Sequence, residues 1–77
     1  MAHWNYRVLR HADGSVAIYE VHYDDAGKPH ACTEEPTGFV GDSIEELRSE
    51  LALAERGLQE KILDYESFGS KTGVKGA

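Results

Sequence analysis

The side chains best suited to chemistry are four potential metal ligands, Glu20, His22, His30 and Cys32. Carboxylate, imidazole and thiolate groups are the ligands that zinc takes in proteins. In the strand pairing set out below, His22 faces His30 and Glu20 faces Cys32. The chain has no C-x-x-C or H-x-x-x-H spacing, however, and histidines on a solvated sheet face account for the same residues. We therefore expect no metal and no cofactor, and these four residues are the candidates to test.

No catalytic arrangement stands out. Cys32 has a possible base in His30, but Glu20 and the pair Glu34-Glu35 would raise the pKa of the thiol and so oppose its activation. In Glu34-Glu35 and in Asp24-Asp25, adjacent strand or turn residues do not converge as an acid–base pair. The chain has no glycine-rich phosphate loop and no G-x-S-x-G motif. These patterns predict that the protein is not an enzyme.

A helix in the second half of the chain has the clearest start signal. Ser43 and Glu46 have the spacing of a capping box, in which each side chain accepts from a backbone amide near the other. Apolar residues then recur every three or four positions, which predicts one buried stripe. The stripe consists of Ile44, Leu47, Leu51, Ala54 and Leu58. Gly57 could either lie inside the helix or end it as the residue after its last turn; because Leu58, Ile62 and Leu63 extend the apolar pattern, we expect the helix to continue to about Leu63.

Two strands before this helix form a predicted hairpin. Residues 4–11 and 15–24 alternate in polarity, and Asp13-Gly14 between them is typical of a two-residue turn. This turn pairs Val8 with Tyr19, Tyr6 with Val21, and Arg7 with Glu20. The aromatic residues then share the side that the helix covers, and the opposite charges pair on the other side.

A third strand is expected from Pro29 to about Glu35, after a turn with Gly27 in the left-handed position of a three-residue loop. The predicted fold is therefore α+β: a three-stranded antiparallel meander with one amphipathic helix packed on one face. We expect residues 1–68 to form one domain. Residues 69–77, rich in Gly, Ser, Thr and Lys, are expected to be disordered.

Composition limits the function classes. The 77 residues carry a formal net charge of −6, which disfavours nucleic acid and favours a basic protein partner. One cysteine excludes an internal disulfide. The chain has neither a long apolar run nor a signal-peptide pattern, so we expect a cytoplasmic protein that does not enter a membrane.

The stretch from Pro36 through Gly38 to Gly41-Asp42-Ser43-x-Glu45-Glu46-Leu47 resembles the start of the helix in the HicB-like antitoxin domain. The resemblance implies a βββα unit, part of an RNase H-like arrangement without nuclease chemistry, that binds a small RNA-cleaving toxin. No DNA-binding segment follows Leu63, so the family's DNA binding is not carried over. The whole chain also resembles small uncharacterised bacterial proteins, which implies no activity.

The preferred function is a non-enzymatic, antitoxin-like module that binds a basic protein. The alternatives are a phage- or plasmid-type acidic inhibitor that mimics nucleic acid, and a small metal-binding protein. We also expect a homodimer, formed through a sheet edge or through an apolar patch on the uncovered sheet face. The residues of this partner or dimer surface are Arg7, Leu9, Val16, Ile18 and Glu20.

Overall fold

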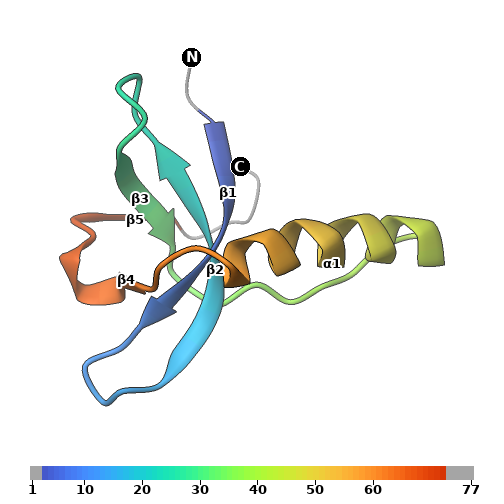
Figure 1. Cartoon of the computed structure of the whole chain (residues 1–77), viewed down its shortest axis with the longest axis horizontal. Helices are drawn as coiled ribbons and strands as arrows, with labels where there is room; N and C mark the ends of the chain where they lie inside the picture. Colours follow the sequence, from blue (N-terminus) through green and yellow to red (C-terminus); the bar gives the residue numbers. More distant parts are fainter. Residues whose placement is uncertain (1–2, 73–77) are drawn as a thin grey trace.

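The structure, a computed structural model, describes residues 3–72 (Figure 1). It confirms an α+β fold with one helix among these residues. The elements in chain order are β1 (His3–Arg10), β2 (Val16–Tyr23), β3 (Pro29–Thr33), α1 (Ile44–Leu58), β4 (Leu63–Asp64), the 3-10 turn η1 (Tyr65–Ser67) and β5 (Ser70–Thr72).

The predicted antiparallel meander β1-β2-β3 is present, but it is the middle of a larger mixed sheet. Within the described residues the strand order is β4-β1-β2-β3-β5, with β4 parallel to β1 and β5 parallel to β3. A meander of only three strands was therefore wrong. The tail predicted to be disordered from residue 69 begins instead with β5, and residues 73–77 lie outside the described part.

The predicted register of the first hairpin was wrong by one residue. β1 and β2 pair Tyr6 with Glu20 and Val8 with Ile18. The loop contains three residues, not two, because His11 N donates to Ser15 O at 2.8 Å and Gly14 N donates to His11 O at 2.9 Å. Gly14 has a φ of +91°, the left-handed position that follows a type I turn in such loops.

The second loop has the same construction, and here the prediction is confirmed. Asp24 N donates to Lys28 O and Gly27 N donates to Asp24 O, both at 2.9 Å, while Gly27 has a φ of +81°. A bulge then interrupts the pairing of β2 and β3 between His22 and Tyr23. Both hairpins therefore have the same type of three-residue loop. In the first loop, the Asp-Gly pair is equally compatible with a two-residue turn, so the sequence did not distinguish the two.

The one-residue shift redistributes the side chains between the two sides of the sheet, as the period of two requires. Tyr6 and Val8 lie on one side together with Glu20, and α1 packs against β1 there; we call this the helix side. Leu9, Tyr19 and Val21 lie on the other side. The aromatic residues are therefore split between two faces, where the predicted register gathered them on one.

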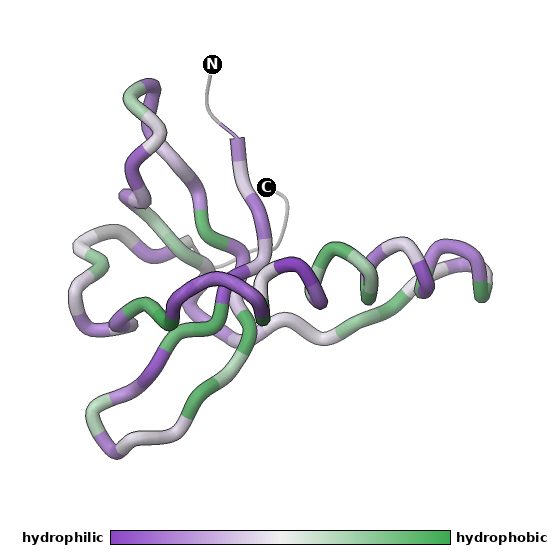
Figure 2. Tube along the Cα trace, in the orientation of Figure 1, coloured by the Kyte–Doolittle hydropathy of each residue, from purple (hydrophilic) through white to green (hydrophobic). Residues whose placement is uncertain are grey.

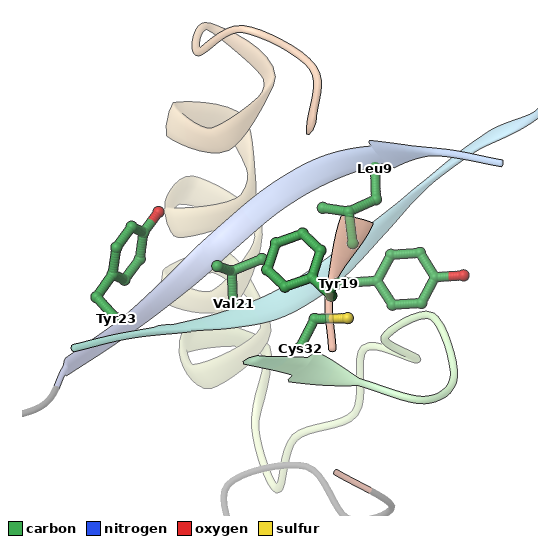
Figure 3. Close-up of a cluster of buried hydrophobic side chains, with 6 residues drawn as sticks. Leu9, Tyr19, Val21, Tyr23 and Cys32 are labelled. Carbon is green, nitrogen blue, oxygen red and sulfur yellow. The ribbon is translucent and has the colours of Figure 1, made fainter. Parts of the chain in front are cut away.

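The main core lies on the side away from the helix. Its buried members are Leu9, Tyr19, Val21, Tyr23, Cys32 and Phe68. Figure 3 shows the strands between this cluster and α1. Because β4 joins one edge of the sheet and β5 joins the other, the chain between them must cross this face, and Phe68 is buried on the way. We call residues 61–72 the strap, and this face the strap side.

The start of α1 confirms the predicted cap. Ser43 Oγ accepts from Glu46 N at 3.1 Å, and the Glu46 carboxylate accepts from Asp42 N at 3.1 Å, one residue earlier than predicted. The end differs, because α1 stops at Leu58 and not near Leu63. The chain must turn there to bring Leu63 beside Leu9 in the sheet.

Candidate functional site

The structure does not bring the four potential metal ligands together. Glu20 and His22 share the helix side, 3.9 Å apart between Glu20 Oε1 and His22 Nε2. Cys32 pairs with Val21 and lies on the strap side, and His30 is exposed at the bulge. Across residues 3–72, no three His, Cys, Asp or Glu side chains are grouped so that they could hold a metal ion.

Cys32 is a core residue. Its side chain is fully buried in the cluster of Figure 3. Burial raises the pKa of the thiol, and the nearby Lys71 ammonium opposes this only partly. A thiol that is buried and protonated at neutral pH is a poor nucleophile.

The predicted dimer surface does not exist as one patch. Leu9 is fully buried and Arg7 is 8% exposed, both on the strap side. Val16, Ile18 and Glu20 lie on the helix side, because Val16 pairs with Arg10 and Ile18 with Val8. The register error put Leu9 and Ile18 side by side in the prediction, whereas they face opposite ways.

Arg7 has a structural role. Its Nη2 donates to Lys61 O at 2.9 Å, which ties β1 to the first residue of the strap. Its Nη1 lies 3.0 Å from the Tyr23 hydroxyl, which donates to Asn5 Oδ1 at 2.7 Å. These hydrogen bonds hold the Arg7 guanidinium inside the fold.

A cluster of His11, Tyr19 and Tyr65 lies where the strap crosses the sheet. His11 Nε2 and the Tyr19 hydroxyl are 2.6 Å apart, Tyr65 packs on both rings, and Lys71 Nζ lies 4.6 Å from the Tyr65 ring centre. Burial is the main cause that raises the pKa of both tyrosines above the ordinary 10.0. Phenols with raised pKa values stay protonated at neutral pH, so they do not form a general base. The adjoining hollow of about 220 Å³ is lined by Arg10, His11, Ala12, Ile62, Leu63 and Asp64.

Helix α1 offers a different kind of site. Its carboxyl end lies at the sheet, and in Figure 1 its amino end projects farthest from the strands. The side that rests on the body carries the half-buried Leu47 and Glu50 and the buried Ala54 and Gly57. The Tyr6 hydroxyl donates to the Glu50 carboxylate from the sheet below.

Gly57 lies where the helix backbone comes close to the backbone of β1. A Cβ atom at this position would lie 2.2 Å from Tyr6 O and 2.8 Å from Tyr6 C. Only a residue without a side chain allows the helix backbone to come so near β1. The contact side of α1 is therefore centred on the buried Ala54 and Gly57, with the half-buried Leu47 beside them, and does not include Ile44, Leu51 or Leu58 of the predicted stripe.

Most of the predicted stripe is exposed. Ile44 is 60% exposed, Leu51 is 52% exposed and Leu58 is 54% exposed. These residues are seven positions apart, almost two full turns, so they form one line along the helix of about 21 Å. We call them the α1 stripe; Figure 2 shows apolar residues along this projecting helix. The prediction that Ile44, Leu51 and Leu58 pack on the sheet was therefore wrong.

The sequence contains a signal for the contact side of α1 that the apolar spacing does not include. Gly57, the one glycine inside the helix, marks where two backbones approach closely, and Ala54 lies one turn earlier on the same side. Other exposed large apolar side chains among the described residues are Val40, Leu53, Trp4, Val16 and Ile62, of which only Leu53 lies in the helix. The charges on the stripe's own flank are Arg48 and Glu55, both exposed.

Comparison with protein-family models, with curated proteins and with solved structures found no match to this chain. No helix in the described part of the chain has both the length and the apolar character needed to cross a membrane.

Proposed function

We propose that the protein is a non-enzymatic module that binds another protein chain through the α1 stripe. The observation that carries this proposal is the alignment of Ile44, Leu51 and Leu58, each more than half exposed, on a helix that projects from the body. Single exposed apolar residues are ordinary, but a continuous exposed line is typical of an interaction surface. An amphipathic helix that packs its apolar line on another protein is a common recognition mode.

The lack of a converging group of candidate ligands within residues 3–72 supports the non-enzymatic part of the proposal. The candidate ligands Glu20, His22 and Cys32 lie on two sides of one sheet, and Cys32 is buried. His11 and Tyr19 contact each other, and Tyr65 packs against Tyr19, so this pair has a structural role in holding the strap to the sheet. The side chains that remain accessible on α1 are those that recognise a protein surface.

The charge of the chain favours a basic protein over nucleic acid as a further partner of the module. The net charge of −6 repels phosphates, and Asp42, Glu45 and Glu46 gather at the projecting end of α1. A basic, toxin-like partner is also what the resemblance of the helix cap to the HicB-like antitoxin domain implies.

Site-specific photo-crosslinking in the producing cells tests the proposal. A photoreactive phenylalanine derivative replaces Leu51 in one variant and Ser49 in the control. Ser49 is also exposed, but two residues correspond to about 200° around the helix, so it lies nearly opposite the stripe. We expect adducts with a protein chain, either this one or another, from position 51 and not from position 49. Equal yields from both positions, or no adducts, would contradict the proposal.

A further inference from the structure

We infer that the α1 stripe binds a second copy of this chain, with the two helices antiparallel around a two-fold axis at Leu51. The inference rests on the proposed function, because it names the chain that occupies the same stripe. Three observations support it: the spacing of the stripe, the charges on its flank and the position of the body at one end of the helix.

The stripe is symmetric about its middle. Leu51 is seven residues from Ile44 and seven from Leu58, so an antiparallel pair centred on Leu51 forms three apolar layers. Leu51 meets Leu51 of the second copy in the central layer. Ile44 meets Leu58 of the second copy in each outer layer. All three side chains of one copy, each more than half exposed, are therefore covered by the same three side chains of the other.

The flank of the stripe carries one positive and one negative charge. Arg48 and Glu55 are exposed and seven residues apart, so they lie on the same side of the apolar line. In the antiparallel pair, Arg48 comes beside Glu55 of the second copy, and the symmetry makes this contact twice. A parallel pair would instead put each charge at the level of its own kind. Charges flanking an apolar helix seam set orientation in this way.

Within residues 3–72, the side chains of Arg48 and Glu55 form no ion pair and no hydrogen bond. Arg48 and Glu55 are therefore available to a second copy. Their pairing is a case of charge complementarity between two identical surfaces, which a closed two-fold interface requires.

The shape of the molecule favours the same orientation. α1 meets the body through Ala54 and Gly57 near its carboxyl end, while its amino end projects (Figure 1). Antiparallel helices place the two bodies at opposite ends of the pair. Parallel helices would place both bodies at the same end, side by side.

The sheet edges are weaker candidates for self-association. The outer edge of β1 is covered by β4 at Leu9 and Arg10, and by Gly57 of the helix at Tyr6. β3 is covered by β5 from Ala31 to Thr33. The edge pairing expected from the sequence would have to displace these elements, whereas the stripe is already exposed.

Sedimentation velocity of the purified full chain with paired charge reversals tests the inference. At tens of micromolar we expect the unmodified chain to sediment as a dimer. Arg48→Glu and Glu55→Arg alone should each raise the dissociation constant about tenfold or more, because each creates two like-charge contacts. The double variant, with both charges exchanged, should return close to the unmodified value. Arg56→Glu, the same charge change on the opposite side of the helix, is the matched control and should have little effect.

The outcomes separate this inference from the proposed function. All these positions are exposed, and circular dichroism verifies that each variant remains folded. A monomer at every concentration, together with crosslinks from position 51 to a different protein, overturns the dimer and leaves the binding module in place. A dimer that ignores the charge reversals, or one that the double variant does not restore, overturns the antiparallel arrangement. Loss of crosslinks from position 51 to any protein overturns both.

Discussion

At the scale of the single residue, Gly57 determines how close α1 comes to the sheet. Backbone pairing alternates along β1, and His11 is bonded to Ser15, so the carbonyl of Tyr6 points away from β2. Gly57 lies against that carbonyl. The helix thereby covers part of a strand edge that would otherwise present unpaired backbone groups. A glycine that weakens the helix in isolation is thus needed for its attachment.

We expect Gly57→Ala to destabilise the protein. Alanine at a helix interior position normally stabilises by up to about 1 kcal/mol relative to glycine. Here the new Cβ would lie 2.2 Å from Tyr6 O, so either the helix or β1 must move, at a net cost of about 1–3 kcal/mol. The midpoint of urea denaturation measures the effect. Gly38→Ala is the control, because a Cβ at Gly38 meets no atom within 4 Å. A Gly57→Ala midpoint at or above that of the unmodified protein would contradict this contact.

Ser43→Ala removes the N-cap of α1. The variant leaves Glu46 N without its acceptor at 3.1 Å, and lost caps of this type cost about 1 kcal/mol. Urea denaturation should show a lower midpoint with an unchanged slope. Ser49→Ala, in the exposed middle of the helix, should leave the midpoint equal or slightly higher. If the two variants have the same stability, Ser43 does not act as the cap.

At the scale of the element, the strap closes the fold. It pairs with β1 through β4 and with β3 through β5, and between the two it buries Phe68. The Tyr65 hydroxyl donates to Glu34 O at 3.0 Å, and Lys71 Nζ donates to Phe68 O at 2.6 Å. The strap therefore supplies the second layer that covers the main core.

Phe68→Ala should be the most destabilising of these substitutions. Removing a buried aromatic side chain costs about 3–5 kcal/mol, and Phe68 is only 6% exposed. Denaturant titration gives the loss, and increased binding of an apolar dye would report the uncovered strap side. Leu58→Ala, on the exposed stripe, is the control and should cost much less in the monomer. Equal losses for the two variants would show that the strap does not cover the core.

The strap also marks the limit of what the sequence predicts. Local signals were sufficient for the cap at Ser43, for the strands, and for the loop around Gly27, because each depends on a few neighbouring residues. Local signals did not determine the length of the first loop, because Asp-Gly fits both a two-residue and a three-residue turn. The length of this loop decides which side of the sheet every β2 residue faces. Residues 63–64 and 70–72 pair with β1 and β3, which are far away in the sequence, and no local pattern predicts such long-range pairing.

The site shows the same division. The apolar spacing of Ile44, Leu51 and Leu58 was visible in the sequence, but whether that line meets the sheet or the solvent depends on how the helix docks. Gly57 settles the docking side, because a Cβ there would lie 2.2 Å from Tyr6 O, a tertiary effect that a periodicity argument does not contain. The candidate ligands failed for the reason already given, the one-residue error in register.

At the scale of the whole molecule, one small meander supports two unequal layers. The strap side holds the main cluster, with four ionisable side chains, Tyr19, Tyr23, Tyr65 and Cys32, within or against it. The helix side holds α1 by a short contact and leaves much of its apolar surface exposed. We therefore expect substitutions on the α1 stripe, the proposed binding surface, to change association with little change in the fold of the monomer.

Stability should fall at alkaline pH. Burial raises the folded-state pKa of Cys32 above its ordinary 9.0 and those of Tyr19 and Tyr65 above 10.0. The unfolded chain therefore loses these protons first, so the stabilising contribution is complete below pH of about 9 and is lost as pH rises through the folded-state values. Urea midpoints between pH of about 8 and 11 measure the decline. Tyr19→Phe should decline less steeply than the unmodified chain; an identical slope would show that Tyr19 does not contribute.

The position of the strap in the chain has a consequence for biosynthesis. The chain emerges from the ribosome from its amino end, so both hairpins and α1 emerge before residues 61–72 do. Until then, Leu9, Val21 and Cys32 have no cover on the strap side. The nascent meander is therefore an apolar surface exposed to chaperones, and the last segment of the fold to be translated is the one that ends that exposure.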